Sequence, residues 1–255
     1  MNATTQPAGT PLRAVLLDVG GTLLGEARPR AAIYADAARS RGIDVDDARM
    51  LALMRRAHRA LPVVLDGAYR YSDRWFQAFI GKIFADELGL DRARLADTTE
   101  ELFARFEDAD TFRVFPGCVE LLDACRARGL ALGVVSNWSA RLPRVLAATG
   151  LAERLDFVVC SALERCEKPD RAIFELALER AGVPASAALH AGDHVRNDGY
   201  GAREAGIEPV LVEHGGRQAA SVAPDAVGNA PDGAGAFRRV GGLSELARLI
   251  LSRLP

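Results

Sequence analysis

Side chains suited to phosphoryl-transfer chemistry occur at four points of this 255-residue chain. A carboxylate can attack phosphorus and become an aspartyl phosphate. A lysine can hold the nucleophile and the phosphoryl group as a point charge. A hydroxyl and nearby N–H groups can bind phosphoryl oxygens, and carboxylates are hard oxygen ligands for Mg²⁺. The four points are Asp18, Ser136-Asn137, Lys168-Pro169 and the stretch from Asp193 to Asp198.

The elements predicted around these points bring them to one edge of a sheet. Asp18 ends the apolar run Ala14-Val15-Leu16-Leu17, which is typical of a strand buried on both faces. Beyond residue 115, strands alternate with helices, which indicates a parallel sheet whose strand ends meet where such folds bind ligands. The predicted strands are 130–135, 157–160, 187–191, 209–212 and 237–240, and the predicted helices are 116–128, 142–149, 170–181, 197–205 and 243–254.

Each polar group also has a purely structural interpretation. Asp18 could cap a turn, and Ser136 and Asn137 could cap the next helix. Lys168 could be solvated like most lysines, and Asp193 and Asp198 could cap and charge a helix N-terminus. These interpretations leave unexplained why all four points fall at carboxyl ends of strands. Gly20 and Gly21 after Asp18 allow a sharp turn and leave backbone groups open to a ligand.

A long helical insert is predicted directly after the first strand. Helices are expected at 29–41, 46–60, 72–88 and 91–106, and no convincing strand between residues 25 and 110. We therefore expect an α/β fold, a core of residues 12–24 and 111–255 with an all-helical cap at 25–110. Residues 1–11 are expected to be a disordered tail, and 215–236, rich in Gly, Ala, Pro and Asp, a long loop.

Composition narrows the class of protein. The formal net charge of −2 and pI of about 6.1 argue against a nucleic-acid-binding protein. No apolar stretch has membrane-spanning length, and the N-terminus lacks the features of a secretory signal. The four cysteines form no Cys-x-x-Cys pair, so we expect reduced thiols in the cytoplasm. A monomer and a homodimer both stay open.

In the order of its motifs the chain resembles the haloacid dehalogenase superfamily, over about residues 12–213. The resemblance implies a Rossmann-like, three-layer core with a parallel sheet, and the insert looks like the family's small helical cap. Many members of that branch are phosphatases or uncharacterised hydrolases. The matching motifs are Asp18-Val19-Gly20-Gly21-Thr22-Leu23, Val135-Ser136-Asn137, Glu167-Lys168-Pro169-Asp170 and His190-Ala191-Gly192-Asp193 through Asn197-Asp198.

The resemblance implies a phosphatase acting on a small, anionic, phosphorylated metabolite. Asp18 would be the nucleophile, and Lys168 would bind the phosphoryl group. The contacts to substrate would also come from Ser136, Asn137, Gly21 and Thr22. Mg²⁺ would lie on Asp18, the Gly20 carbonyl and Asp193, with Asp198 supporting the metal waters or Lys168.

One position departs from the family pattern. Family phosphatases carry a second Asp two residues after the nucleophile, which protonates the leaving oxygen and later activates water, and here that residue is Gly20. Such general acid–base help is typically worth about 10²–10⁴-fold in rate. Another group could supply it, the substrate could need little protonation, or the protein could be a binding or scaffold protein with weak or no turnover. The candidate replacements are His194, His58 and Tyr71.

Two other activities rank lower. Dehalogenases of the superfamily also lack this Asp, but they lack the acidic metal motif that Asp193 and Asp198 retain here. A phosphonatase would need a cap lysine for a Schiff base, and the cap offers Lys82, for which a solvated position is the simpler interpretation. Two basic stretches of the cap, 55–59 and 70–75, could select an anionic, ringed substrate or form a solvated face, the latter being favoured. Trp138 could line the pocket mouth or pack under the cap.

Overall fold

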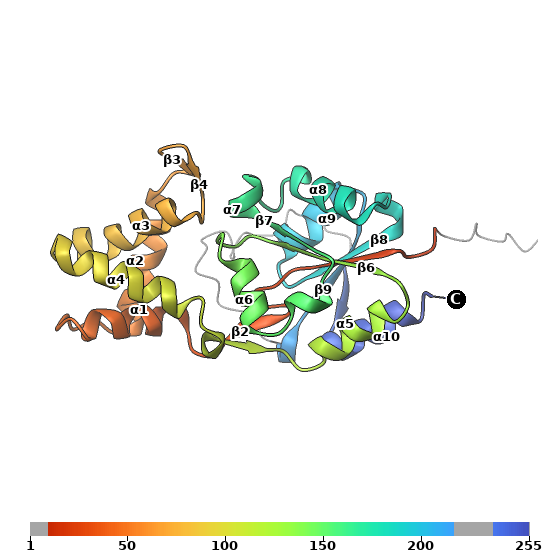
Figure 1. Ribbon diagram of the computed structural model, residues 1–255, viewed down its shortest axis with the longest axis horizontal. Coiled ribbons are helices and arrows are strands. Elements are labelled where there is room, and N and C mark those ends of the chain that lie inside the picture. The colour runs from red at the N-terminus through yellow and green to blue at the C-terminus, as the bar shows by residue number, and fades with distance from the viewer. Residues whose placement is uncertain (1–9, 217–236, 255) are drawn as a thin grey trace, which may run out of the picture.

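The computed structural model of the chain describes residues 10–216 and 237–254 (Figure 1). Of the expected tail, residues 1–9 lie outside the described residues, and so do residues 217–236 of the expected loop. Within the described ranges, no helix combines the length and the apolar character that crossing a membrane requires. The description below therefore concerns the core sheet, its flanking helices and the inserted helices.

A six-stranded sheet forms the centre of the molecule (Figure 1). Its strand order is β10-β9-β8-β1-β6-β7, and every recorded pairing is parallel. This confirms the α/β class and the parallel sheet predicted from the alternation of strands and helices. The strands are β1 (Ala14–Leu17), β6 (Ala131–Ser136), β7 (Phe157–Cys160), β8 (Ala188–Gly192), β9 (Glu208–Val212) and β10 (Arg238–Val240).

Helices cover both faces of the sheet, and β1 shows how the faces are divided. Its four residues are fully buried, and successive side chains point to opposite faces. Val15 and Leu17 belong to the apolar cluster with α5, α6 and α10, whereas Ala14 and Leu16 belong to the cluster with α8 and α9. These helices are α5 (Cys118–Arg126), α6 (Leu142–Ala148), α8 (Arg171–Ala181), α9 (Gly201–Glu204) and α10 (Leu243–Leu251).

The register of β1 positions the candidate site. Leu17, the last residue of β1, pairs with Val134 of β6 on one side and Ala191 of β8 on the other. Polar residues that follow these three strands therefore emerge side by side at the carboxyl edge. The chain runs from β1 towards β7 and then continues at β8, so the strand order reverses next to β1, the usual ligand-binding crevice of open α/β sheets.

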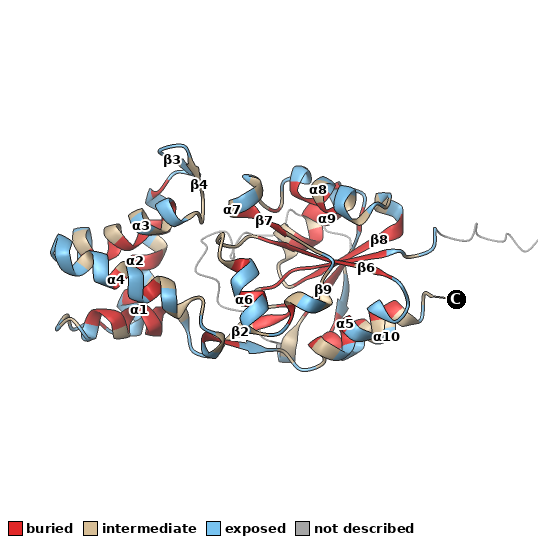
Figure 2. Cartoon of the chain, viewed as in Figure 1, coloured by how far each residue is buried: buried red, intermediate tan, exposed pale blue. Residues whose placement is uncertain are grey.

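The inserted helices build a second apolar core of their own (Figures 1 and 2). Trp75 and Phe84 are fully buried in it. The insert is joined to the sheet domain by an antiparallel pair of strands, β2 (Leu24–Glu26) and β5 (Phe112–Val114). The helices are α1 (Arg30–Arg39), α2 (Asp47–Ala60), α3 (Asp73–Gly81), the π-helical segment Lys82–Glu87 and α4 (Arg92–Arg105).

The expectation of no strand between residues 25 and 110 was wrong in detail. Besides β2, the insert contains the two-residue strands β3 (Val64–Leu65) and β4 (Ala68–Tyr69), paired antiparallel. Asp66 and Gly67 between them both have positive φ, which is the geometry of a two-residue hairpin turn favoured by Asp-Gly. Strands this short leave almost no alternating pattern in the sequence, so the Asp-Gly pair was the available signal.

Two predicted helices change type along their length. The helix expected at 72–88 continues beyond α3 as the π-helical segment, and the one expected at 197–205 consists of a π-helical segment, Val195–Tyr200, followed by α9. In the first segment the wider turn buries the adjacent residues Ile83 and Phe84 together. Short helices not predicted from the sequence occur at α7 (Ser161–Glu164), Ala109–Thr111, Ala152–Arg154, Ala185–Ala187 and His214–Gly216.

Candidate active site

Asp18, at the end of β1, lies between two polar groups from distant parts of the chain. Ser136 Oγ donates to Asp18 Oδ1 at 2.9 Å, and Lys168 Nζ lies 2.7 Å from the same oxygen. All three side chains are almost completely buried, with Asp18 6%, Ser136 2% and Lys168 4% exposed. The residues predicted to be the nucleophile and its two phosphoryl-binding partners thus converge on one carboxylate oxygen.

Asp198 forms the second contact of the Lys168 ammonium group. Its Oδ1 lies 2.6 Å from Lys168 Nζ and 2.9 Å from His190 Nε2, and its Oδ2 accepts the His194 N–H at 2.9 Å. Gly192 allows this approach, since a Cβ at that position would overlap the Asp198 carboxylate. No role was predicted for His190, although a histidine in the middle of a buried strand was a signal for a buried polar partner.

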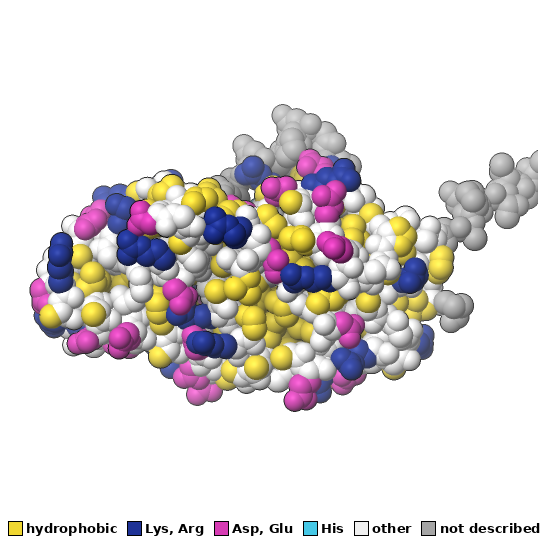
Figure 3. Space-filling view, turned by 45° about the horizontal axis from the view of Figure 1, so that its top comes forward, with side chains coloured by type: hydrophobic (Ala, Val, Ile, Leu, Met, Phe, Trp, Pro, Cys, Tyr) yellow, Lys and Arg dark blue, Asp and Glu magenta, His cyan; other side chains and the backbone are white. Residues whose placement is uncertain are grey.

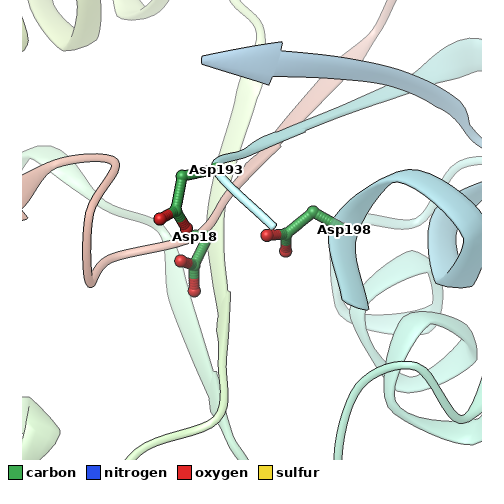
Figure 4. Close-up of side chains that lie close together, drawn as sticks. All are labelled: Asp18, Asp193 and Asp198. Atoms are coloured by element: carbon green, nitrogen blue, oxygen red, sulfur yellow. The ribbon is translucent and has the colours of Figure 1, made fainter. Parts of the chain in front are cut away.

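Asp193 completes a group of three carboxylates with Asp18 and Asp198 (Figure 4). One ligand oxygen from each lies within 4.8 Å of the others. Figure 4 shows the carboxylates of Asp18 and Asp193 close together, with Asp198 directed towards them from the adjoining helical segment. Gly21, with φ +79°, packs against Asp193, and a Cβ there would overlap that carboxylate. The two polypeptide segments can therefore approach closely only because residue 21 is glycine.

The charges in this site do not balance. Three carboxylates gather in a mostly buried position with one ammonium group, that of Lys168, which contacts Asp18 and Asp198. Burial raises the pKa of Asp193 to about 8, helped by the charges of Asp18 and Asp198. Burial likewise raises the pKa of Asp18, although Lys168 opposes this effect. An excess of buried, hard oxygen donors is the donor set that suits a divalent cation, so these residues could hold a metal ion.

Lys168 and Asp198 stay charged in this setting. Burial alone would lower the pKa of Lys168, but the charges of Asp18 and Asp198 raise it above its ordinary value. Burial alone would raise the pKa of Asp198, but Lys168 and a hydrogen bond to His190 bring it well below its usual range. Lys168 is thus a permanent cation beside the Asp18 carboxylate.

Two residues expected at the substrate are engaged with the protein instead. Asn137 donates from Nδ2 to the Lys168 carbonyl at 2.8 Å, and its Oδ1 accepts the Lys168 N–H at 2.7 Å. Its amide therefore holds the backbone of the lysine. The Thr22 hydroxyl is fully buried. The backbone carbonyl of Thr22 lies 2.8 Å from His214 Nε2.

The residues considered as replacements for the missing acid lie in structural settings. His58 Nε2 lies 3.1 Å from the Tyr71 hydroxyl, and both rings pack around Trp75 inside the cap. His194 Nδ1 accepts the Asn197 N–H at 3.1 Å and so caps the π-helical segment. Lys82, which was considered only as the Schiff-base lysine of a phosphonatase, has a side chain that is 39% exposed and pairs with Asp86 at 3.8 Å.

The basic stretches of the cap make ion pairs as well. Arg56 pairs with Glu87, and Arg74 with Asp66 at 2.7 Å. Arg70 reaches across to the core and lies 3.1 Å from Glu167. On the face shown in Figure 3, charges of both signs are interspersed rather than gathered into one basic surface.

Arg141 connects the core to the cap, a role that no sequence pattern indicated. Its guanidinium donates to both oxygens of Asp73 on α3, one of them at 3.0 Å, and Nε lies 2.7 Å from Glu107 Oε1 beyond α4. The guanidinium also lies 3.8 Å from the centre of the Phe103 ring. Arg141 is only 12% exposed and follows the loop that carries Ser136 and Asn137. One core side chain thus touches two parts of the cap next to the candidate site.

These features define the chain as an α/β protein with a parallel sheet and an inserted helical cap. Comparison with known proteins identifies the family. The model of the haloacid dehalogenase-like hydrolases matches residues 12–206, so the chain belongs to that family. The haloacid dehalogenase-like hydrolase domain-containing protein 3 of Mus musculus is 34% identical over 205 residues, 79% of this chain and 82% of the mouse protein. A phosphoserine phosphatase of Thermus thermophilus is 28% identical over 223 residues, 80% of this chain and 90% of that protein.

Solved structures show the same fold. A haloacid dehalogenase-type phosphatase of Thermococcus onnurineus superposes with a TM-score of 0.65, covering 95% of this chain and 99% of that one at 24% identity. An L-2-haloacid dehalogenase superposes with a TM-score of 0.70, covering 94% and 99% at 20% identity. At these identities the likeness concerns the fold alone, and it does not separate a phosphatase from a dehalogenase.

Proposed function

We propose that this protein is a Mg²⁺-dependent phosphatase of a small phosphorylated metabolite, working through an aspartyl phosphate on Asp18. The observation that supports it most is the group of three carboxylates, two of which are buried and paired with Lys168. A dehalogenase would have no use for this excess of negative charge, because its substrate needs no metal to offset phosphate oxygens. The relatives named as phosphatases support the same activity.

Each residue of the site has a role that follows from its position. Asp18 supplies the nucleophilic oxygen, and Lys168, 2.7 Å away, favours its ionised form and attracts the phosphoryl oxygens. Ser136 orients the same carboxylate through its hydroxyl. Asn137 and Asp198 hold Lys168 in place from its backbone and its ammonium group. Mg²⁺, held by Asp18, Asp193, Asp198 and the Gly20 carbonyl, would offset negative charge on the phosphoryl group.

We further propose that residues 25–110 act as a lid that selects the substrate. Arg70 and Arg141 place cap residues against the core on the side where the candidate site lies. The four cysteines are free thiols, three of them buried, which suits a reducing compartment such as the cytoplasm. As partner we propose a small anionic molecule and neither nucleic acid nor membrane.

The test is phosphate release with and without Mg²⁺ from a panel of acyl, aryl and sugar phosphates. We expect activity that EDTA abolishes and that Asp18→Asn removes, with Lys82→Met as a surface control that keeps it. Thermal unfolding should show a Mg²⁺-induced rise in Tm that is lost in Asp193→Asn. Activity that survives Asp18→Asn would contradict the mechanism. Tight ligand binding without turnover would favour the binding-protein alternative.

A further inference from the structure

The ring of Trp138 lies against the position that a Cβ at residue 20 would take. Gly20 is two residues beyond Asp18 in the turn that leaves β1. A Cβ built at Gly20 would lie 3.0 Å from Trp138 Cζ3, and its next two nearest atoms, at 3.7 and 4.0 Å, belong to the same ring. A contact of 3.0 Å is tighter than ordinary van der Waals distance, so a Cβ at residue 20 requires the indole to give by a few tenths of an ångström.

Several contacts keep Trp138 in that place. Its backbone N–H donates to Ser161 Oγ at 3.1 Å, and its backbone carbonyl accepts from Cys160 Sγ at 3.2 Å. Its ring packs on Phe112 of β5 with the ring centres 5.7 Å apart. Trp138 also follows Ser136, whose hydroxyl is bonded to Asp18, by two residues. The indole is therefore fixed relative to the nucleophile by the loop that orients the nucleophile.

The groups beside the nucleophile at this point are the residue-20 glycine and carbon atoms of the Trp138 indole. Neither the glycine nor the indole carbons facing it can give a proton to a departing oxygen. The wall beside the nucleophile is thus apolar, and within the described part of the chain general acid catalysis, worth about 10²–10⁴-fold, has no donor on this side.

Resting on the proposed function, we propose that Trp138 and Gly20 restrict the enzyme to phosphates whose leaving group is a weak base, namely acyl phosphates and phosphates of acidic phenols. Asp18 forms a bond to phosphorus, the bond from phosphorus to the leaving oxygen breaks, and that oxygen keeps the electron pair. A carboxylate or an acidic phenolate is stable in that form, whereas an aliphatic alkoxide is not. Water then attacks phosphorus, the bond to Asp18 breaks, the carboxylate is restored and the proton of the water leaves with phosphate or solvent.

A Brønsted series of aryl phosphates with Mg²⁺ tests this proposal directly. For the wild type we expect log(kcat/KM) to fall steeply as the phenol becomes less acidic, by about 10²-fold or more from p-nitrophenyl to phenyl phosphate, the size of effect that general acid help would remove. Acetyl phosphate should be a good substrate and glycerol phosphate a poor one. Since the second step also lacks a base, p-nitrophenolate should appear in a burst equal to the enzyme concentration.

Three variants distinguish the effect of the Trp138 ring from the effect of a general loss of structure. Gly20→Asp alone should gain little, because the indole crowds the position that its Cβ would take. Gly20→Asp combined with Trp138→Ala should flatten the series and raise kcat/KM for phenyl phosphate at least tenfold. Trp138→Phe, which retains an apolar ring, should leave the series steep. The Mg²⁺-induced rise in Tm reports in each variant that the site is intact.

Two results would overturn the proposal in distinguishable ways. A flat series in the wild type, with rapid hydrolysis of glycerol phosphate, would show that another group donates the proton while the phosphatase itself stands. Release of phosphate from none of these compounds would remove the proposed function together with this inference. A flat series for Trp138→Phe would also contradict the role given to the ring.

Discussion

Lys168 Nζ lies 2.7 Å from Asp18 Oδ1 although the two residues are 150 positions apart in the chain. The same ammonium group lies 2.6 Å from Asp198 Oδ1. One buried cation therefore holds two carboxylates that would otherwise repel each other across a medium of low polarity. Both the stability of the metal-free protein and its chemistry should depend on this contact.

Lys168→Met should destabilise the metal-free protein and abolish turnover. Removing one partner of a buried ion pair leaves the other charge without compensation, which typically costs about 3–5 kcal/mol. Urea unfolding at neutral pH in EDTA measures this loss in the free energy of unfolding. Lys82→Met, on the cap surface, is the matched control and should change it by less than about 0.5 kcal/mol. Equal losses in the two variants would show that the Lys168 contact does not stabilise the fold.

The stability of the metal-free protein should fall as the pH rises from about 4 to 8. Asp193 has a pKa of about 8 in the folded protein against an ordinary value of 3.8, so in this range the folded state binds more protons than the unfolded state. The free energy of unfolding then decreases with pH by up to about 1.4 kcal/mol per unit. The depressed pKa of Asp198 acts only below this range.

Asp193→Asn isolates this effect. Urea titration in EDTA gives the free energy of unfolding of both proteins at each pH. Relative to the wild type, the variant should become more stable as the pH rises towards 8. Saturating Mg²⁺ should flatten the wild-type profile because it offsets the carboxylate charges. A difference that is constant with pH would mean that Asp193 titrates normally.

Gly21→Ala and Gly42→Ala form a matched pair for the metal site. Both glycines have φ of +79°, so alanine should cost each a similar amount of strain, about 1–2 kcal/mol. Around Gly42 a Cβ would meet nothing within 4 Å, whereas at Gly21 it would overlap the Asp193 carboxylate. Calorimetric titration with Mg²⁺ should therefore show lost affinity in Gly21→Ala alone. Undiminished affinity in that variant would place the metal elsewhere.

Arg141→Ala should loosen the cap without unfolding the core. The side chain is 12% exposed and contacts Asp73, Glu107 and Phe103, whereas its neighbour Arg144 is 71% exposed and contacts Glu107. We expect KM to rise about tenfold, since a smaller closed population lowers apparent affinity by the same factor. Hydrogen exchange in β2 and β5, which join the cap to the core, should also become faster.

Arg144→Ala is the control for this prediction. It removes a positive charge that also pairs with Glu107, but from an exposed position. Ion pairs at such positions contribute about 0–1 kcal/mol. Its KM and its hydrogen exchange in the connecting strands should stay close to those of the wild type. If the two variants behave alike, the buried contacts of Arg141 do not hold the cap.

The sequence by itself was sufficient to predict the parallel sheet and the polar residues that follow its strands. The run Ala14–Leu17 is apolar throughout because both faces of β1 are covered, and this requirement is local and visible in the sequence. Ser136, Lys168 and Asp193 were predicted at strand ends for the same reason. The turn residues that end each strand, Gly and Asp above all, carry their own backbone preferences and mark these positions.

Only the tertiary structure decided which side chains pair. Asn137 holds the backbone of Lys168, the Trp138 ring fills the place beside Gly20, and Arg141 reaches two parts of the cap. These contacts join segments that are far apart in the chain, and they depend on how the cap and the loops pack against the sheet. No local pattern records such packing, because a tryptophan or an arginine in a loop has the same backbone preference whether it faces solvent or a neighbouring segment.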